Sequence, residues 1–116
     1  MHLFHVVHGL AARPEVIGAA IISGDGLVIH QVLPAGADPD ALAALATTLL
    51  RHTAELGAAA RLGPLTTAVL DFGPGPVIVS ALGEGAALVL LVRADADFGE
   101  LLYLVRRHQP AIAGLL

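Results

Sequence analysis

Apolar residues along the chain follow two kinds of pattern, short unbroken runs and longer helical repeats. Residues 16–22 and 86–92 are almost entirely apolar and rich in branched side chains, which indicates strands buried on both faces of a sheet. Residues 2–12 and 39–62 repeat their apolar positions every three or four residues, which indicates helices. The pattern therefore predicts a domain that combines helices with a sheet.

Gly24-Asp25-Gly26 separates the first apolar run from a second one at 27–33. Glycines beside an acidic residue can form a phosphate-binding loop, but such a loop opens into a helix and usually carries Lys and Ser/Thr. Here a β-branched run follows the glycines, and the chain has no lysine. Because glycine readily takes the positive φ of a tight turn, residues 16–33 predict a β-hairpin.

Turn residues divide the rest of the chain. Asp38 and Pro39 suit the N-cap and first position of the long helix, and a Gly-Pro pair should end it. Three strands are expected next, over 65–72, 77–82 and 86–92. A last helix follows, with Asp95 as its expected cap, and Pro110 should kink or end it.

The resulting order is α-β-β-α-β-β-β-α, in one domain that spans residues 1–116. Short turns make neighbouring strands antiparallel. Because the strands at 16–22 and 86–92 are apolar on both faces, helices should cover both sides of the sheet. We therefore expect an α/β chain of the α+β type with an antiparallel sheet.

The long helix carries two apolar stripes. The first is expected to lie on the sheet and consists of leucines: Leu42, Leu45, Leu49 and Leu56. The second consists mostly of small residues, which let another helix come close: Ala43, Thr47, Leu50, Ala54 and Ala58. A helix on the surface of a monomer needs only one stripe, so the second predicts contact with another helix. The alternative is that its alanines are simply good helix formers on the surface.

Composition supports a second contact. Hydrophobic residues make up 56% of the chain before glycine is counted, whereas soluble domains have about 45–50% with glycine included. A chain of 116 residues buries only about two-thirds of its unfolded surface. The surplus predicts an obligate dimer, although alanine tolerated on the surface is an alternative explanation.

Charge and cysteine content exclude several classes of function. A net charge of −4 without any lysine argues against nucleic acid and against an anionic membrane surface as the main partner. Without cysteine there is no disulfide framework and no thiolate metal site. No apolar run reaches about 18 residues without turn residues, and the N-terminus lacks the features of a signal peptide. We therefore expect a cytoplasmic protein that does not insert into membranes.

Candidate chemistry is sparse. No Ser/His/Asp arrangement, carboxylate pair or phosphate loop is present, so we expect neither an enzyme nor a bound cofactor. His2, His5 and His8 share one helical face, and imidazoles bind Zn²⁺ or Ni²⁺. A solvated face is favoured over a metal site, because no carboxylate lies nearby in the sequence. His52, at the edge of the leucine stripe, should be partly buried, or else part of a pH-sensitive dimer contact.

Three segments carry a further signal within this order of elements: PEVIGAAIISGDGLVIHQVLP (14–34), DALAALATTLL (40–50) and GEGAALVLLVRADADFGELL (83–102). Together they resemble the Roadblock / dynein light chain domain family, including the bacterial MglB-like regulators of Ras-like GTPases. The resemblance covers nearly the whole chain. It implies a five-stranded antiparallel sheet, with the long helix on one face and the first and last helices on the other.

The resemblance also implies how the chain assembles. Family members dimerise by pairing their third strands and packing their second helices, which makes a continuous sheet. In this chain the implied interface residues come from the small-residue stripe and the strand at 65–72: Ala43, Thr47, Leu50, Ala54, Ala58, Thr66, Ala68 and Leu70. A heterodimer with a paralogous Roadblock chain is the alternative to a homodimer.

The resemblance further implies a non-enzymatic regulator or binding partner of a small Ras-like GTPase, with a possible activating role. A scaffold subunit of a larger complex is the first alternative, and a small-molecule sensor domain is the second. An activating protein can neutralise the transferred phosphoryl group with an arginine. Arg61 and Arg93 lie nearest to element ends, but MglB-like members act by repositioning the GTPase's own groups.

Overall fold

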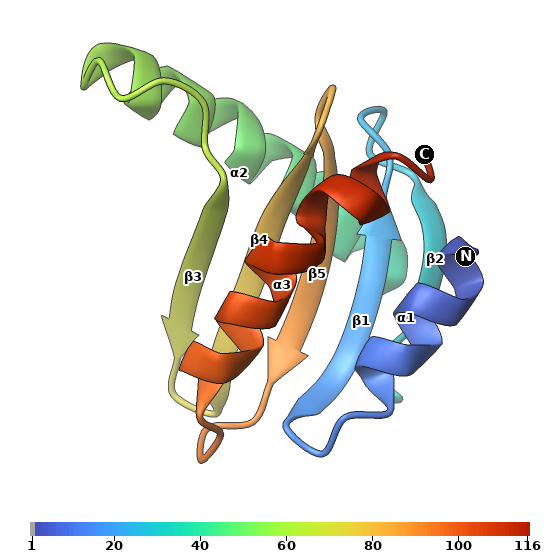
Figure 1. Cartoon of the computed structure of the whole chain (residues 1–116). Helices are drawn as coiled ribbons and strands as arrows, with labels where there is room; N and C mark the ends of the chain where they lie inside the picture. The colour runs from blue at the N-terminus through green and yellow to red at the C-terminus, as the bar shows by residue number, and fades with distance from the viewer. Residues whose placement is uncertain (1) are drawn as a thin grey trace.

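The computed structural model describes residues 2–116, which form three helices and five strands (Figure 1). The helices are α1 (Leu3–Ala11), α2 (Pro39–Ala59) and α3 (Phe98–Ala113). The strands are β1 (Val16–Ile22), β2 (Val28–Val32), β3 (Thr67–Phe72), β4 (Gly75–Gly83) and β5 (Ala86–Val92). This succession confirms the predicted order α-β-β-α-β-β-β-α.

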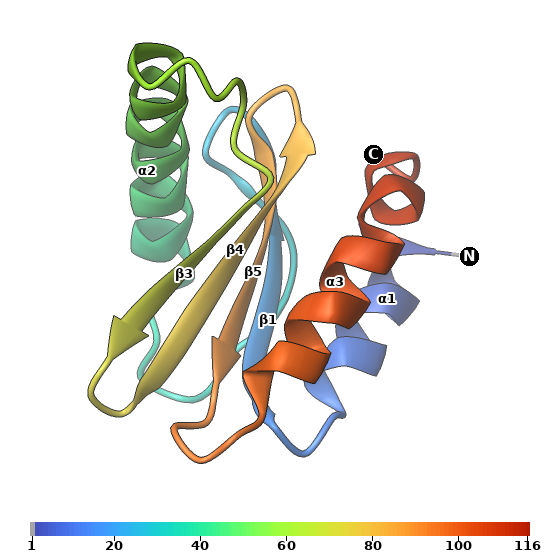
Figure 2. The same cartoon turned by 60° about the vertical axis from the view of Figure 1, so that its left-hand side comes forward.

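The strands form one antiparallel sheet in the order β2-β1-β5-β4-β3. The strongly apolar strands β1 and β5 are central, as their sequences predict, and β2 and β3 form the two edges. Figure 2 shows α1 and α3 on one face of the sheet and α2 on the other. The predicted α+β layers are therefore confirmed.

A separate hydrophobic core lies on each face of the sheet. The larger core joins the sheet to α1 and α3, and the smaller core joins it to α2. β5 contributes to both, because successive side chains of a strand point to opposite faces. Leu88 and Leu90 enter the larger core, and Ala87 and Val89 enter the smaller one. This double burial explains why the strand has no polar residue.

The start of α3 differs from the sequence prediction. Asp97, rather than Asp95, is the N-cap, and its carboxylate accepts a hydrogen bond from the Gly99 N–H at 3.2 Å. Asp95 instead pairs with Arg93, at 3.3 Å between Oδ1 and Nε. Both aspartates satisfy the preference for a short acidic cap, and Asp97 serves because the helix begins at Phe98.

Pro110 bends α3 but does not end it. The helix continues to Ala113, and its last turn is displaced from the axis of the earlier turns in Figure 2. A proline inside a helix removes one backbone donor and pushes against the preceding turn, which accounts for the bend.

The end of α2 also differs from prediction, since the helix stops at Ala59. Arg61 takes a left-handed φ of 58°, and its N–H donates to the Ala58 carbonyl at 3.1 Å. The Leu62 N–H donates to the Gly57 carbonyl at 2.9 Å. These two bonds form a Schellman motif, in which glycine usually occupies the left-handed position. The chain therefore reverses before it reaches the Gly-Pro pair.

We predict that Gly57→Ala destabilises the protein. Alanine is normally favoured over glycine inside a helix by roughly 0.8–1 kcal/mol, but a Cβ at Gly57 would overlap the backbone carbonyl oxygen of Gly63. Gly9 in α1 is the matched control, because a Cβ there meets nothing within 4 Å. Gly9→Ala should raise the free energy of unfolding by about 0.5–1 kcal/mol. Urea denaturation followed by circular dichroism measures both changes, and equal stabilisation by the two would contradict the prediction.

Candidate protein–protein interface

α2 meets the sheet through small side chains. Its two buried residues are Ala43 and Ala46, which are 0% and 8% exposed. Beneath them lie branched side chains of β1, β4 and β5, including Ile22, Val79 and Val89. Because alanine is short, the helix backbone lies close to these strands at this point, and leucines such as Leu50 pack at the edge of the contact.

The prediction that the leucine stripe lies on the sheet is wrong for two of its four members. Leu45 and Leu56 are each 68% exposed, whereas Leu42 and Leu49 are half-buried at the margin of the smaller core. Leu45 and Leu56 are about three helical turns apart, so they project from the same side of the helix. His52 lies between them with 65% of its side chain exposed, so the expectation of a partly buried histidine is also wrong.

Among the eight residues predicted for the dimer interface, one is inaccessible in the chain. Ala43 is buried inside the chain, and a partner could reach it only if α2 left the sheet. The other seven are half-buried or exposed: Thr47, Leu50, Ala54, Ala58, Thr66, Ala68 and Leu70. Their role in an interface stays a prediction, while Ala43 serves the contact between helix and sheet.

β3 is an edge strand, and within residues 2–116 it pairs with β4 alone. Two of its apolar side chains are exposed, Val69 at 38% and Phe72 at 56%. An unpaired apolar edge is a template for another strand. Figure 1 shows the chain running from the C-terminal end of α2 through a loop into the start of β3. Val69 points to the α1–α3 face of the sheet, because its register partner Ile78 belongs to the larger core. We use the name α2–β3 surface for two exposed features together: the outward side of α2, with Leu45, His52 and Leu56, and the free edge of β3, with Phe72.

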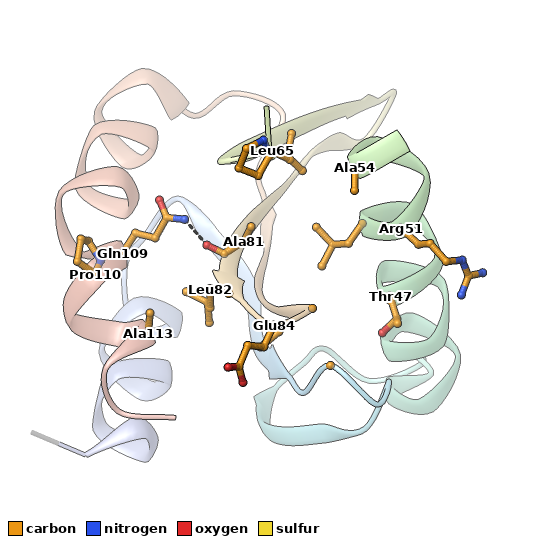
Figure 3. Close-up of a pocket in the computed structure, with 16 residues that line it drawn as sticks. Thr47, Arg51, Ala54, Leu65, Ala81, Leu82, Glu84, Gln109, Pro110 and Ala113 are labelled. Atoms are coloured by element: carbon orange, nitrogen blue, oxygen red, sulfur yellow. Dashed lines mark hydrogen bonds between the residues drawn. The ribbon is translucent and has the colours of Figure 1, made fainter. Parts of the chain in front are cut away.

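A pocket of about 700 Å³ adjoins this surface (Figure 3). It lies between the C-terminal half of α2, the segment before β3, the tip of the β4–β5 hairpin and the end of α3. Its polar side chains are Thr47, Arg51, Glu84 and Gln109. Gln109 donates hydrogen bonds to the carbonyl oxygens of Ala81 and, at 3.5 Å, Thr66. The lining contains one carboxylate and no His, Cys or Ser, so it has the character of a binding cavity.

Histidines from two elements gather around Phe4. The ring centroids of His2 and His5 are 5.8 Å apart, and those of His2 and His30 are 6.5 Å apart. His8 stacks on Phe4 with a centroid distance of 4.1 Å. Sequence periodicity could not include His30, because only the hairpin brings β2 next to α1. In the part of the chain that the structure describes, no group of three or more His, Cys, Asp or Glu residues could hold a metal ion.

Arginines near element ends are already engaged or exposed. Arg93 pairs with Asp95, and Arg61 occupies the exposed left-handed position after α2. Arg13 pairs with Glu15 at 2.5 Å between Nε and Oε1, within the loop that joins α1 to β1. The hydrogen bond from Arg13 holds the pKa of Glu15 below its ordinary value.

This ion pair predicts a pH-dependent contribution to stability. A carboxyl group whose pKa is lowered by folding stabilises the native state above its unfolded pKa, and this stabilisation is lost as the pH falls through the folded pKa. Glu15→Gln should therefore lower the free energy of unfolding at pH 7 by roughly 0.2–1 kcal/mol. Urea titrations at pH 7, 5 and 3 should show this difference shrinking toward zero. Glu84→Gln, at the exposed tip of the β4–β5 hairpin and outside the ion pairs found among residues 2–116, is the control. A difference that persists at pH 3 would contradict the ion-pair explanation.

The sequence profile of the Roadblock/LC7 domain matches residues 5–92. The chain therefore belongs to the Roadblock/LC7 domain family, as the resemblance of its three segments indicates. A comparison with curated protein sequences found no match. Within residues 2–116, no helix combines the length and the apolar character needed to span a membrane.

Solved structures of this family and of MglB proteins share the fold. A Roadblock/LC7 domain from Streptomyces avermitilis is 24% identical, with a TM-score of 0.79, and the match covers 98% of this chain and 93% of that one. MglB from Myxococcus xanthus is 11% identical, with a TM-score of 0.89 and coverage of 97% and 93%. An MglB with a tetrameric arrangement is 21% identical, with a TM-score of 0.84 and coverage of 97% and 86%.

Proposed function

We propose that the chain is a non-enzymatic homodimer that regulates or binds a small Ras-like GTPase in the cytoplasm. The observation that carries the proposal is the α2–β3 surface, which combines an exposed apolar helix side with an open strand edge on a Roadblock/LC7 domain. The fold shared with MglB structures supports the GTPase as partner, because the family resemblance implies that class of protein.

The α2–β3 surface suits a two-fold contact. In a symmetric dimer the same patch faces itself, so Leu45 and Leu56 are each buried twice. Complete burial of a leucine is worth about 1.5–3 kcal/mol relative to exposure. Pairing of two β3 edges would satisfy their free backbone groups and extend the sheet across both copies. The accessible residues of the small-residue stripe lie on the other side of α2 from these leucines, so they offer a separate contact.

We predict that Leu56→Glu converts the dimer to a monomer, because it would place two carboxylates in an apolar contact. Light scattering after size-exclusion chromatography measures the mass. Ala44→Glu is the matched control, since it adds the same charge at an exposed position of α2 outside the leucine line. A dimer that survives Leu56→Glu would refute this surface. Ala54→Glu then tests the small-residue stripe separately.

The GTPase proposal is tested by single-turnover hydrolysis of GTP by a Ras-like GTPase from the same cell. An excess of this protein should accelerate hydrolysis by about a hundredfold, which corresponds to about 2.7 kcal/mol off the barrier. Arg61→Ala and Arg93→Ala should leave the acceleration intact, because neither arginine is proposed to reach the phosphates. Loss of acceleration in either variant would assign that arginine a direct role. If this protein binds the GTPase without accelerating GTP hydrolysis, it is a binding partner and not an activator.

The two alternative functions, a scaffold subunit and a small-molecule sensor, predict different results for the same purified protein. A scaffold would bind its partner equally whether the GTPase holds GDP or GTP. A sensor would use the pocket of about 700 Å³, which lies within the range of roughly 300–1,000 Å³ typical of small-molecule sites. Stabilisation of the protein by a metabolite in thermal unfolding would favour the sensor, because a ligand that binds only the native state raises its stability.

A further inference from the structure

Charge is distributed unevenly along the α1–α3 side of the molecule, away from the α2–β3 surface. α1 contains no acidic residue, and the second half of α3 carries Arg106, Arg107 and His108. Carboxylates are concentrated instead where α3 begins, at Asp95, Asp97 and Glu100. A chain with a net charge of −4 thus presents one region poor in carboxylates beside another that is rich in them.

A groove of about 260 Å³ lies between α1 and α3 in the basic region. Its floor is apolar and includes Leu88, Val105 and Ile112, which are 0%, 2% and 3% exposed. His5 of α1 and His108 of α3 are exposed at its rim. Arg13 also lines the groove, but Glu15 already neutralises it. We call this site the α1–α3 groove.

Helical spacing assigns the two neighbouring arginines to different sides of α3. Arg107 follows Leu104 by three residues and precedes Ala111 by four, and both of these line the groove. Arg106 lies three residues before Gln109, which points the other way and bonds to the Ala81 carbonyl. None of the ion pairs found among residues 2–116 includes either arginine. Arg107 is therefore a free positive charge beside the groove.

The start of α3 has the complementary chemistry. Phe98 is 39% exposed and is surrounded in sequence by Asp95, Asp97 and Glu100, all of them exposed. The pairing of Asp95 with Arg93 leaves 77% of its side chain accessible. We call Asp95, Asp97, Phe98 and Glu100 the acidic end. It combines one aromatic anchor with several carboxylates, whereas the groove combines an apolar floor with a rim free of unpaired carboxylates.

We propose that the α1–α3 groove of one molecule binds the acidic end of a second copy, with Phe98 of that copy in the groove. The volume of about 260 Å³ lies below the roughly 300–1,000 Å³ of small-molecule sites. It suits a single anchoring side chain, the usual centre of a protein contact. The groove is also concave, whereas a membrane-binding helix presents protruding apolar side chains to lipid.

The contact must join different molecules. The groove uses residues 104–112 of α3, and Phe98 lies at the first position of the same rigid helix. Because donor and acceptor are different surfaces, the association is head-to-tail and can continue into rings or open chains. It therefore differs from the two-fold contact proposed for the α2–β3 surface and does not depend on it.

Sedimentation velocity at 50 and 500 mM NaCl tests this association in the full chain, with Leu56→Glu present to remove the proposed two-fold contact. Species larger than the monomer should form at low salt and dissociate at high salt, since charge attraction between exposed groups is screened. Arg107→Glu should weaken the association at least tenfold, and Arg106→Glu should leave it nearly unchanged. Adding Glu100→Arg to Arg107→Glu should restore it. Equal effects of the two arginine changes, or no association at low salt, would overturn the proposal.

Cross-linking locates the contact directly, because the chain has no cysteine of its own. Gly9→Cys places a thiol at the groove, in open space. Ala94→Cys places one beside the acidic end without removing any of its residues. Mixing the two proteins under mild oxidation should give a mixed disulfide dimer. In the control, Ala59→Cys, with its thiol at the end of α2 instead of at the groove, is mixed with Ala94→Cys.

Cross-linking of the groove thiol no greater than that of the control would overturn the assignment. Circular dichroism of each variant establishes that it is folded before it is compared. Binding of the chain to anionic lipid vesicles through Arg107, without self-association, would likewise overturn the proposal and assign the groove to a membrane surface.

Discussion

The contact between α2 and the sheet rests on two alanines, and much of the molecular surface follows from it. Ala43 and Ala46 let the helix lie close to strands whose own branched side chains fill that face. The larger residues of α2 either pack at the edge of this core, as Leu50 does, or project away from the sheet. Leu45 and Leu56 are exposed because they lie on the side of the helix opposite to Ala43 and Ala46. The apolar surface offered to a partner is thus a direct result of close packing inside the chain.

The sheet could be predicted from sequence, whereas the orientation of α2 could not. β1 and β5 are apolar at almost every position, which is the pattern expected of strands between two layers of helices. A helical wheel instead suggests that the larger side chains face the core. Which stripe of α2 meets the sheet depends on the volume that the strands leave free, and that volume is set by residues far away in the sequence, such as Val79.

The candidate sites depend even more on contacts between distant segments. The α1–α3 groove joins residues 5–13 to residues 104–112, and no local pattern in either helix indicates the packing that creates it. His30 joins the histidines of α1 for the same reason. Local sequence rules were more successful at helix starts. They predicted Asp38 as the N-cap of α2 correctly, and for α3 they predicted an aspartate two positions before the actual N-cap.

The end of α2 has a consequence for how fast and how tightly a partner could associate. Backbone hydrogen bonds in the Schellman motif, together with the close approach of Gly57 and Gly63, hold a helix tip that has no buried side chains of its own. A surface that is already ordered loses little conformational entropy when it is covered. Its encounters with another molecule can then be productive without a preceding folding step, and its affinity is not reduced by the population of a rare open state.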